Sequence, residues 1–333
     1  TSEIMCCMWL VSIVAVQLAV DAPVGTVYLI DASIYIFQAH FSPYTECYDA
    51  QNNDLSAVYG FTRFLLQFIN RIQPSYIAIA RDESLFSGFR HQLCPNYKSN
   101  RELPDENLKA QLDACALVCD AMGLANFASR LYEADDILGT LAARISRLEN
   151  PKLAACIVSK DKDLAQLLVN ERNYLWDFSS NRKRYRQDVF NEYGVYPEQF
   201  PDYLGLVGDS VDVISGVPSV GPVKAKALLG EFPTIEAIYE NLNAVGDLKF
   251  RGAKSLPRVL ADNLAAAQLS KALATIECDV RSEDESFSST NYEDLKAGLP
   301  DKSGFEDLLR ELNFQNAERE SLLYQFERVF KIT

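Results

Sequence analysis

Histidine is almost missing from this chain, which contains only two, His40 and His91, among 333 residues. This scarcity argues against reactions that pair a serine or cysteine nucleophile with an imidazole base. The eight cysteines form no Cys-x-x-Cys pair and have no histidine at zinc-ligand spacing, so a zinc site is disfavoured as well. We therefore expect chemistry based on carboxylates and metal, and reduced, buried thiols in a cytoplasmic protein.

Positive charge is also scarce, because 32 lysines and arginines stand against 46 aspartates and glutamates, for a net charge of -14. This balance argues at first sight against a general nucleic-acid binder, although local basic patches beside clustered acids can still bind DNA. Long polar tracts are absent, and 48% of the residues are hydrophobic. The chain is therefore expected to be globular, with one large or two smaller domains.

No charged residue occurs between residues 4 and 20, an apolar run that is slightly short for a membrane span. The run lacks the basic start of a secretory signal, although Val20-Asp21-Ala22 is a passable cleavage site. Three interpretations stay open for residues 1–25: a buried or amphipathic extension, a membrane or signal segment, and a stretch upstream of a misplaced start. We favour the first and the third, and expect no membrane partner.

Three short apolar runs, over 27–30, 76–80 and 153–158, have the character of buried strands. The periodicity of apolar residues predicts a helix over 55–72, between the first two runs, and a further helix over 105–121. Strands that alternate with helices predict an α/β fold with a central, mostly parallel sheet and helices on both faces.

An acid follows each of these runs: Asp31, then Asp82, and finally Asp161 with Asp163. Ligands of parallel sheets bind beyond the carboxyl ends of the strands, so these acids should meet at one edge. A single aspartate after a strand is commonly only a turn or helix-capping residue. An acid after every one of the three runs is more than capping explains.

The densest acidic stretch is Glu133-Ala134-Asp135-Asp136, which lies directly before an apolar helical run over 137–145. One or two acids in a first helical turn complement the helix dipole. Three acids among four residues repel each other unless a cation neutralises them. Together with the strand-end acids, this stretch predicts an acidic metal pocket.

The sequence changes character after residue 196. Asp209 and Asp212 are three residues apart and would face the same way on one helical turn. The stretch 216–222 is a glycine turn that opens a predicted helix, and Lys224 and Lys226 are close by. Free backbone N–H groups at such a turn suit a phosphate, so we interpret it as an anion site in preference to an ordinary helix–turn–helix.

Together these motifs resemble the 5′-nuclease family, which includes the 5′→3′ exonuclease domain of bacterial DNA polymerase I, phage 5′-exonucleases and flap endonucleases. The resemblance runs from about Val27 to Val280. The matching stretches follow the family's order: Asp31, Asp82 with 89–91, 97–101, 133–136, 161–164, 208–212 and 216–222. No polymerase domain follows in this sequence, so the resemblance implies a stand-alone form.

The resemblance implies a role for each matching position. Two Mg²⁺ ions, for which Mn²⁺ can substitute, would be held by carboxylates. The first ion would be surrounded by Asp31, Asp82, Glu133 and Asp135. The second would be held, directly or through water, by Asp136, Asp161, Asp163, Asp209 and Asp212. Lys98 and Arg101 would lie on a helical arch, at about 85–110, and grip the scissile phosphate.

The resemblance further implies contacts with DNA and a division into domains. The DNA contacts would come from Arg90, Tyr97, Gly216, Val217, Ser219, Gly221, Lys224 and Lys226. A PIN-like nuclease domain would cover 26–195. A helix–three-turn–helix module over 196–285 would hold the duplex, with a K⁺ ion on its carbonyl oxygens. The C-terminal segment, 286–333, would pack back on the body.

The expected function is that of a metal-dependent 5′→3′ exonuclease and 5′-flap endonuclease in DNA replication and repair. The protein would act as a monomer on DNA with 5′ ends, flaps or nicks, and RNA primers stay open as a further substrate. The chain departs from the family's usual glycine, phenylalanine and asparagine at Ala32, Arg81 and Val213. No metal carboxylate is lost, but Val213 leaves the geometry of the loop around Asp212 open.

Two other functions compete with this one. A non-catalytic binder of branched DNA would have lost its chemistry, which the loss of a metal carboxylate would indicate. A toxin-like ribonuclease of a related fold would be shorter and would lack the glycine turn. The full set of acids and the second module both favour the nuclease.

Overall fold

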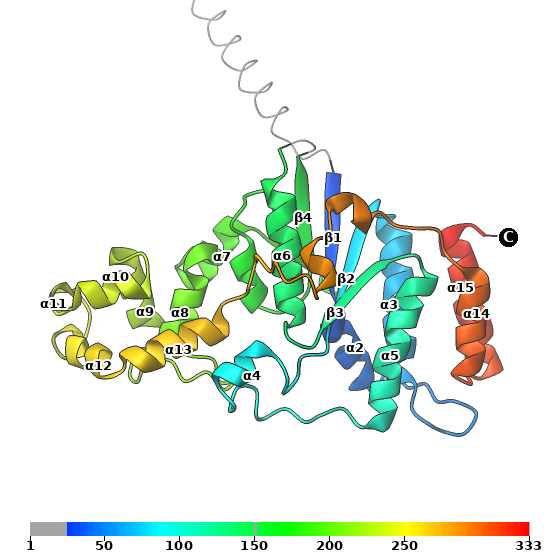
Figure 1. The fold of residues 1–333 in the computed structure, drawn as a ribbon, viewed down its shortest axis with the longest axis horizontal. Helices are drawn as coiled ribbons and strands as arrows, with labels where there is room; N and C mark the ends of the chain where they lie inside the picture. The colour runs from blue at the N-terminus through cyan, green and yellow to red at the C-terminus, as the bar shows by residue number, and fades with distance from the viewer. Residues whose placement is uncertain (1–24, 150–151, 333) are drawn as a thin grey trace, which may run out of the picture.

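The computed structural model describes residues 25–149 and 152–332, so the N-terminal run predicted over 1–25 lies outside the described residues except for Gly25. A six-stranded sheet in the order β3-β2-β1-β4-β5-β6 forms the centre (Figure 1). In the part of the chain described, no helix is both long and apolar enough to cross a membrane. The strands are β1 (Gly25–Asp31), β2 (Tyr76–Asp82), β3 (Ala125–Ser129), β4 (Leu153–Val158), β5 (Tyr174–Asp177) and β6 (Arg182–Arg184).

Strand β1 lies in the middle of the sheet and pairs in parallel with both β2 and β4. Ile30 lies opposite Ile79 on one side and Val158 on the other. Every residue of β4 is buried, as expected of a strand that is covered on both faces. Within this sheet only β6 runs antiparallel, against β5, so the predicted mostly parallel sheet is confirmed.

Helices cover both faces of the sheet (Figure 1). Side chains of a strand alternate between its two faces, so Val27 and Leu29 pack in the core that contains α6, whereas Ile30 packs in the core that contains α3. This arrangement confirms the predicted α/β fold. The helices up to residue 193 are α2 (Ala32–His40), α3 (Ser56–Ile72), α4 (Phe89–Leu93), α5 (Glu106–Ala121), α6 (Ala134–Arg147), the short 3₁₀ helix η1 (Asp163–Leu167) and α7 (Arg186–Tyr193).

Three strands, β3, β5 and β6, were not predicted from the sequence. Four of the five residues of β3 are only partly buried, and β6 consists of three basic residues. Neither strand has the run of buried apolar residues that identified β1, β2 and β4, because both lie at the ends of the sheet. Strand β5 does bury Tyr174, Leu175 and Trp176, but it is only four residues long.

The chain after residue 196 builds a helical module beside the sheet, at the left of Figure 1. Helix α13 packs along α8 at the centre of this module. Residues 273–280, which we call the strap, then lead back from α13 to α6. The helices are α8 (Phe200–Val207), α9 (Pro222–Glu231), α10 (Ile235–Glu240), α11 (Leu242–Val245), α12 (Leu256–Asp262) and α13 (Leu264–Ala274).

Two C-terminal helices, α14 (Lys302–Glu311) and α15 (Asn316–Phe330), lie on the opposite side of the sheet from the helical module (Figure 1). They contact α5 and α3. Phe305 and Phe326 are fully buried there, with stacked rings whose centroids are 4.4 Å apart. The C-terminal helices therefore complete the core on that face of the sheet.

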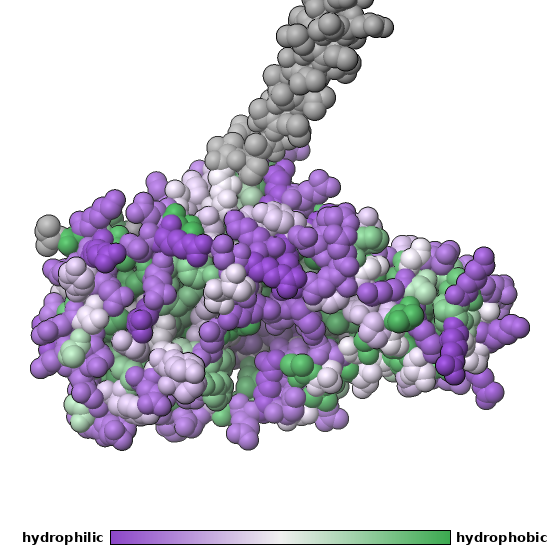
Figure 2. All heavy atoms as spheres, turned by 180° about the vertical axis from the view of Figure 1, so that it is seen from behind, coloured by the Kyte–Doolittle hydropathy of each residue, from purple (hydrophilic) through white to green (hydrophobic). Residues whose placement is uncertain are grey.

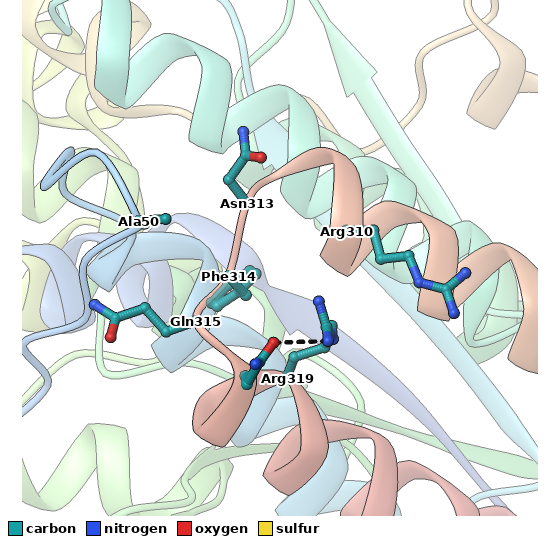
Figure 3. A pocket seen from close by; sticks show the side chains of 7 residues that line it. Ala50, Arg310, Asn313, Phe314, Gln315 and Arg319 are labelled. Carbon is teal, nitrogen blue, oxygen red and sulfur yellow. Dashed lines mark hydrogen bonds between the residues drawn. The ribbon is translucent and has the colours of Figure 1, made fainter.

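A pocket of about 530 Å³ opens between Ala50 and the turn that joins α14 to α15 (Figure 3). Its two arginines already have partners, because Arg310 binds acids of its own helix and Arg319 donates to Asn316. The molecular face in Figure 2 is mostly hydrophilic, with hydrophobic residues in small groups. Neither surface feature brings reactive side chains together.

The packing of α6 against the strap generates a prediction about two glycines. A Cβ atom on Gly139 would lie 2.8 Å from Cγ2 of Ile276 and 2.9 Å from Sγ of Cys278. We expect Gly139→Ala to lower the free energy of unfolding by about 1–3 kcal/mol through overpacking. Gly230 in α9 is the matched control, since nothing lies within 4 Å of its Cβ position.

The control substitution Gly230→Ala should raise the free energy of unfolding by up to about 1 kcal/mol, because alanine has the higher helix propensity. Urea unfolding measures both variants. Changes of the same sign in the two would contradict close packing of the strap on α6.

Candidate metal centre

Acidic side chains gather at the carboxyl edge of the sheet. Asp31 and Asp82 are the last residues of β1 and β2, and Asp161 follows closely after β4. Glu133 is the N-cap of α6, and Asp135 lies in the first turn of that helix. Parallel strands end at the same edge, and this topology places acids from distant parts of the sequence together.

Serine hydroxyl groups and backbone N–H groups orient the strand-end acids. Ser159 Oγ donates to Oδ2 of Asp31 at 2.8 Å and accepts from the backbone N–H of Asp161 at 3.0 Å. Ser84 donates to Oδ1 of Asp82 through its backbone N–H at 2.9 Å and its hydroxyl at 2.8 Å. The sequence analysis missed both serines, although their positions after strand ends were a usable signal.

Four of the acids have no counter-ion. Across 25–149 and 152–332, no lysine, arginine or histidine forms a salt bridge with Asp31, Asp82, Asp135 or Asp161. Burial raises the pKa of Asp31 to about 7, and repulsion from Asp161 and Asp82 adds to the effect of burial. Burial also raises the pKa of Asp82 and Asp135, and Asp135 is further raised by Asp161 and Asp31. Such a group ionises readily only when a cation compensates for the lost water.

Two cations from one loop neutralise acids of other segments. Lys98 Nζ lies 2.9 Å from Oε1 of Glu133 and 3.8 Å from Oδ2 of Asp212. Nη2 of Arg101 lies 2.7 Å from Oδ1 of Asp212. Burial alone would raise the pKa of Glu133, but the charges of Lys98 and Arg90 outweigh burial and lower it. The acid of α6 is therefore held ionised by the protein itself.

A third cation, Lys162, lies between two more of the acids. Its ammonium binds Asp209 and lies 3.5 Å from Oδ1 of Asp163. Burial and the charge of Asp161 nevertheless raise the pKa of Asp163 to about 7. Oδ1 of Asp163 is buried and accepts no hydrogen bond. Although Lys162 stands between two predicted ligands in the sequence, the sequence analysis gave it no role.

The structure corrects the helical arch that was predicted at about 85–110. Only Phe89–Leu93 is helical, as α4, and turns and loops lead from there to the start of α5 at Glu106. Lys98 has a left-handed backbone, with φ of 51°, so it does not share a helix with Arg101. The backbone N–H of Lys98 instead donates to the carbonyl oxygen of Asp212 at 3.1 Å. Pairing with the Asp212 loop, and not a helix, brings the two cations together.

Asp209 and Asp212 do not lie on a helical turn either, contrary to prediction. Asp209 and Ile214 exchange two backbone hydrogen bonds, of 2.9 and 2.7 Å, which close a tight turn. Val213 occupies the left-handed region in this turn, with φ of 59°. A β-branched residue is strained there, whereas the asparagine usual in the family is tolerated. The departure noticed in the sequence therefore has a local structural consequence.

Three predicted site residues are buried inside the protein: Arg90, Tyr97 and Asp136. The Arg90 side chain is only 3% exposed and forms a salt bridge of 2.7 Å with Asp136. Both carboxylate oxygens of Asp136 are occupied, so the structure does not support it as a direct metal ligand. Tyr97 is buried and donates its hydroxyl to Oε2 of Glu133 at 3.2 Å. Arg90 and Tyr97 therefore have no surface with which to contact DNA.

The glycine turn over 216–222 leads into α9, which begins at Pro222 as predicted. Gly216 has φ of 65° and is packed so tightly that a Cβ would lie 2.4 Å from N of Gly208. Val217 is buried as well, so these two residues shape the turn. Ser219 and Gly221 are exposed at the start of α9.

The lysines of α9 already have partners. Lys224 Nζ donates to the carbonyl oxygen of Ser219 at 2.7 Å. Lys226 Nζ donates to the carbonyl oxygen of Glu192 at 3.5 Å. Both lysines are only partly exposed. The turn therefore combines backbone N–H groups with positive charge at its surface.

The acids at the sheet edge suit a divalent cation. All the donors are carboxylate oxygens, which Mg²⁺ and Mn²⁺ prefer. The acids that form no salt bridge in the described residues, and the buried Oδ1 of Asp163, which accepts no hydrogen bond, both call for more positive charge. In the described parts of the chain, no three Asp, Glu, His or Cys side chains already form a cage for an ion. A cation would therefore draw these carboxylates together as it binds.

Comparisons with known proteins agree with this geometry. Residues 26–194 match the model of the 5′-3′ exonuclease N-terminal resolvase-like domain, and residues 195–298 match the 5′-3′ exonuclease C-terminal SAM fold. The chain belongs to the 5′-3′ exonuclease family. Members of this family are hydrolases that cut nucleic acids, so the resemblance found in the sequence is confirmed.

Individual relatives include both short and long proteins. The 5′-3′ exonuclease of Buchnera aphidicola subsp. Schizaphis graminum is 33% identical over 252 residues, 76% of this chain and 86% of that protein. The 5′-3′ exonuclease of Aquifex aeolicus is 29% identical, over 92% of this chain and 96% of that protein. DNA polymerase I of Pseudomonas aeruginosa is 34% identical over 86% of this chain, which spans 30% of the polymerase.

Solved structures share the fold at low sequence identity. The T5 D15 protein co-crystallised with metal ions has a TM-score of 0.61 and 15% identity, over 91% of this chain and 99% of that chain. The catalytic core of Rad2 in complex with DNA substrate has a TM-score of 0.58 and 15% identity, over 95% of this chain and 98% of that chain. The α/β core and the helical module therefore recur together in other proteins.

The raised pKa values predict how stability depends on pH without metal. Asp31 and Asp163 titrate at about 7 in the folded protein, whereas an unfolded aspartate titrates at about 3.9. The folded state therefore binds more protons between these values, and the free energy of unfolding should fall as pH rises from about 4 to 7. In EDTA, we expect Asp163→Asn to flatten this fall by an amount on the order of 2 kcal/mol.

Urea unfolding at pH 5 and pH 8 measures this difference. The control is Asp113→Asn, which changes an exposed acid of α5 and should leave the pH dependence as in the unmutated protein. Mg²⁺ should stabilise the unmutated protein more at pH 8 than at pH 5, because protons compete with the ion at low pH. An identical pH dependence in all three proteins would contradict the raised pKa values.

Relief of backbone strain at Val213 is a separate prediction. Val213→Asn should raise the free energy of unfolding by about 1 kcal/mol, because asparagine tolerates the left-handed region. Val211→Asn is the matched control, since Val211 lies in the same loop, is 62% exposed and has no positive φ. Urea unfolding that shows equal effects at the two positions would count against strain.

Proposed function

We propose that this protein is a metal-dependent 5′→3′ exonuclease and 5′-flap endonuclease that hydrolyses DNA phosphodiester bonds in replication and repair. The observation that carries the proposal is a group of acids at the carboxyl edge of the sheet that form no salt bridge within the described residues: Asp31, Asp82, Asp135 and Asp161. Family membership supports the reaction class. A binder that had lost its chemistry would have no need of these acids.

We infer that two divalent ions bind here, Mg²⁺ with Mn²⁺ as a substitute. When bound, such ions lower the pKa of the attacking water and neutralise charge on the phosphate oxygens. The T5 protein whose crystals contain metal ions has the same fold, which supports a metal centre. The first ion would be held by Asp31, Asp82, Glu133 and Asp135, and the second by Asp161, Asp163, Asp209 and Asp212. Asp136 is left out because Arg90 and backbone N–H groups occupy its oxygens.

Lys98 and Arg101 would change partners during the reaction. In this structure Lys98 neutralises Glu133 and Arg101 neutralises Asp212, and we assign both acids to the metal ions. With those acids committed to metal ions, Lys98 and Arg101 would be available to pair with the scissile phosphate. A positive charge held beside a developing negative charge stabilises the transition state. Since Lys98 is 5% exposed, it would act within the centre and not from the surface.

The helical module over 196–285 would hold the duplex, while 26–195 would perform the chemistry and 286–333 would complete the body. Backbone N–H groups near Ser219 and Gly221 would bind a phosphate, helped by Lys224 and Lys226. The catalytic core of Rad2 has the same fold, and its complexes with DNA substrate support this arrangement. A K⁺ ion on the carbonyl oxygens of the turn stays a prediction. One of these oxygens, that of Ser219, already accepts a hydrogen bond from the ammonium group of Lys224.

The natural substrates would be DNA with 5′ ends, 5′ flaps or nicks. RNA primers stay open as a further substrate. We propose a monomer that works in the cytoplasm. The six described cysteines are free, which agrees with a reducing compartment.

Cleavage of a 5′-flap duplex, labelled in turn at each end, tests the proposed function. We expect release from the 5′ end with Mg²⁺ and none with EDTA. Asp135→Asn should lower the rate at least about 100-fold, because it removes a charge that holds metal, while binding to the duplex persists. Asp113→Asn, on the exposed face of α5, is the control and should cut at the normal rate.

Tight binding of the flap without product in Mg²⁺ or Mn²⁺ would refute the nuclease. It would leave a protein that recognises branched DNA.

A further inference from the structure

Arg90 is buried where three segments meet: α4, the first turn of α6, and the strap that follows α13. Its guanidinium binds both carboxylate oxygens of Asp136, at 2.7 Å each. It also donates to the carbonyl oxygens of Leu273 at 2.9 Å and Thr275 at 2.6 Å. One side chain therefore joins the acidic turn of the nuclease domain to the end of the helical module.

Asp136 completes this connection from the other side. Its Oδ2 accepts the backbone N–H of Glu133 at 2.9 Å, and its Oδ1 accepts that of Glu277 in the strap at 2.8 Å. Arg90 and Asp136 thus each contact both the strap and the start of α6. Glu133, which this network positions, is one of the acids that we assign to the metal ions.

Gln166 forms hydrogen bonds between the strap and a second acidic segment, 161–166. It belongs to η1, which begins at Asp163. The side-chain amide of Gln166 donates to the carbonyl oxygen of Ala274 at 2.8 Å and accepts the backbone N–H of Ile276 at 3.1 Å. The strap is therefore bonded to two of the segments that carry metal-site acids, the start of α6 and η1.

Burial makes these bonds stiff and specific. Asp136 is completely buried and Arg90 almost so, and an ion pair without water tolerates little change in geometry. Gly139 lets the strap lie directly against α6, since a Cβ there would collide with Ile276. The position of the strap relative to the acids is thus fixed by close packing as well as by hydrogen bonds.

We propose that Arg90, Asp136 and Gln166 determine which phosphodiester bond is cut. They are positioning residues that hold the duplex-binding module at one distance from the metal-site acids. This inference rests on the proposed function. Successive phosphates of one strand are about 3.4 Å apart along the helix axis, so a shift of a few ångströms would present a neighbouring bond to the acids.

Three variants loosen the strap in different ways. Arg90→Lys keeps the charge but loses the two-pronged geometry, Asp136→Asn removes the charge of its partner, and Gln166→Leu removes two hydrogen bonds without touching the ion pair. Lys271→Gln is the matched control. Lys271 binds Asp202 at 2.7 Å inside the helical module, so its loss lowers stability without loosening the strap.

The distribution of first cuts on a 5′-flap duplex, measured at low conversion, tests the inference. We expect cuts at one main position for the unmutated enzyme and the control. Cuts at two or more neighbouring positions are expected for the strap variants, with kcat up to about 100-fold lower and KM unchanged. A variant that was only less stable would cut less DNA at the same position.

Two measurements do not depend on catalysis. Hydrogen exchange at 273–280 should become faster in the strap variants than in Lys271→Gln, while exchange in β1 and β4 stays slow. Calorimetric titration with Mn²⁺ should give the unmutated affinity for Gln166→Leu and Lys271→Gln, which leave the contacts of Arg90 and Asp136 with Glu133 intact. A loss of Mn²⁺ affinity in Asp136→Asn, without one in Arg90→Lys, would make Asp136 a metal ligand and overturn the inference.

An unchanged cleavage position in every soluble strap variant would also overturn it. An unmutated protein that cuts no DNA would instead refute the proposed function. Hydrogen exchange would then still show whether these three residues hold the strap.

Discussion

Carboxylates that are buried side by side repel one another, and much of the structure around the sheet edge compensates for that repulsion. Cations from separate loops neutralise some of the acids: Lys98 and Arg101 from the turns after α4, and Lys162 from the segment after β4. Three of the acids without a salt-bridge partner among the described residues, Asp31, Asp82 and Asp135, have raised pKa values. The balance is incomplete, and the missing positive charge is what makes this edge suited to metal ions.

Another acid of the same helical turn has a structural role. Asp136 lies next to Asp135 in the sequence, yet it points into the protein and binds Arg90. This pair, with Gln166, attaches the helical module to the nuclease domain. Neighbouring acids in one helical turn can therefore serve two purposes, because successive side chains of a helix point in directions about 100° apart.

Much of the fold could be predicted from local sequence. The runs that became β1, β2 and β4 are apolar throughout because both faces of these strands are covered. Strands β3 and β6 escaped notice because a strand at the end of a sheet needs less burial, and its residues carry no such signal. The site was harder to predict from the sequence than the fold. The predicted helix around Lys98 is in fact a series of turns, which a hydrogen bond to the Asp212 loop holds in place.

The sequence by itself determined the three central strands of the sheet, the acids at their ends, the acidic first turn of α6 and the family. Each follows from residues that are close in the chain, because strand burial and helix capping are local properties. Only the tertiary structure decided which acids keep a partner and which do not. Lys98 meets Glu133 and Arg90 meets Asp136 across long stretches of sequence. Charge pairing depends on distance in space, and periodicity along the chain carries no record of it.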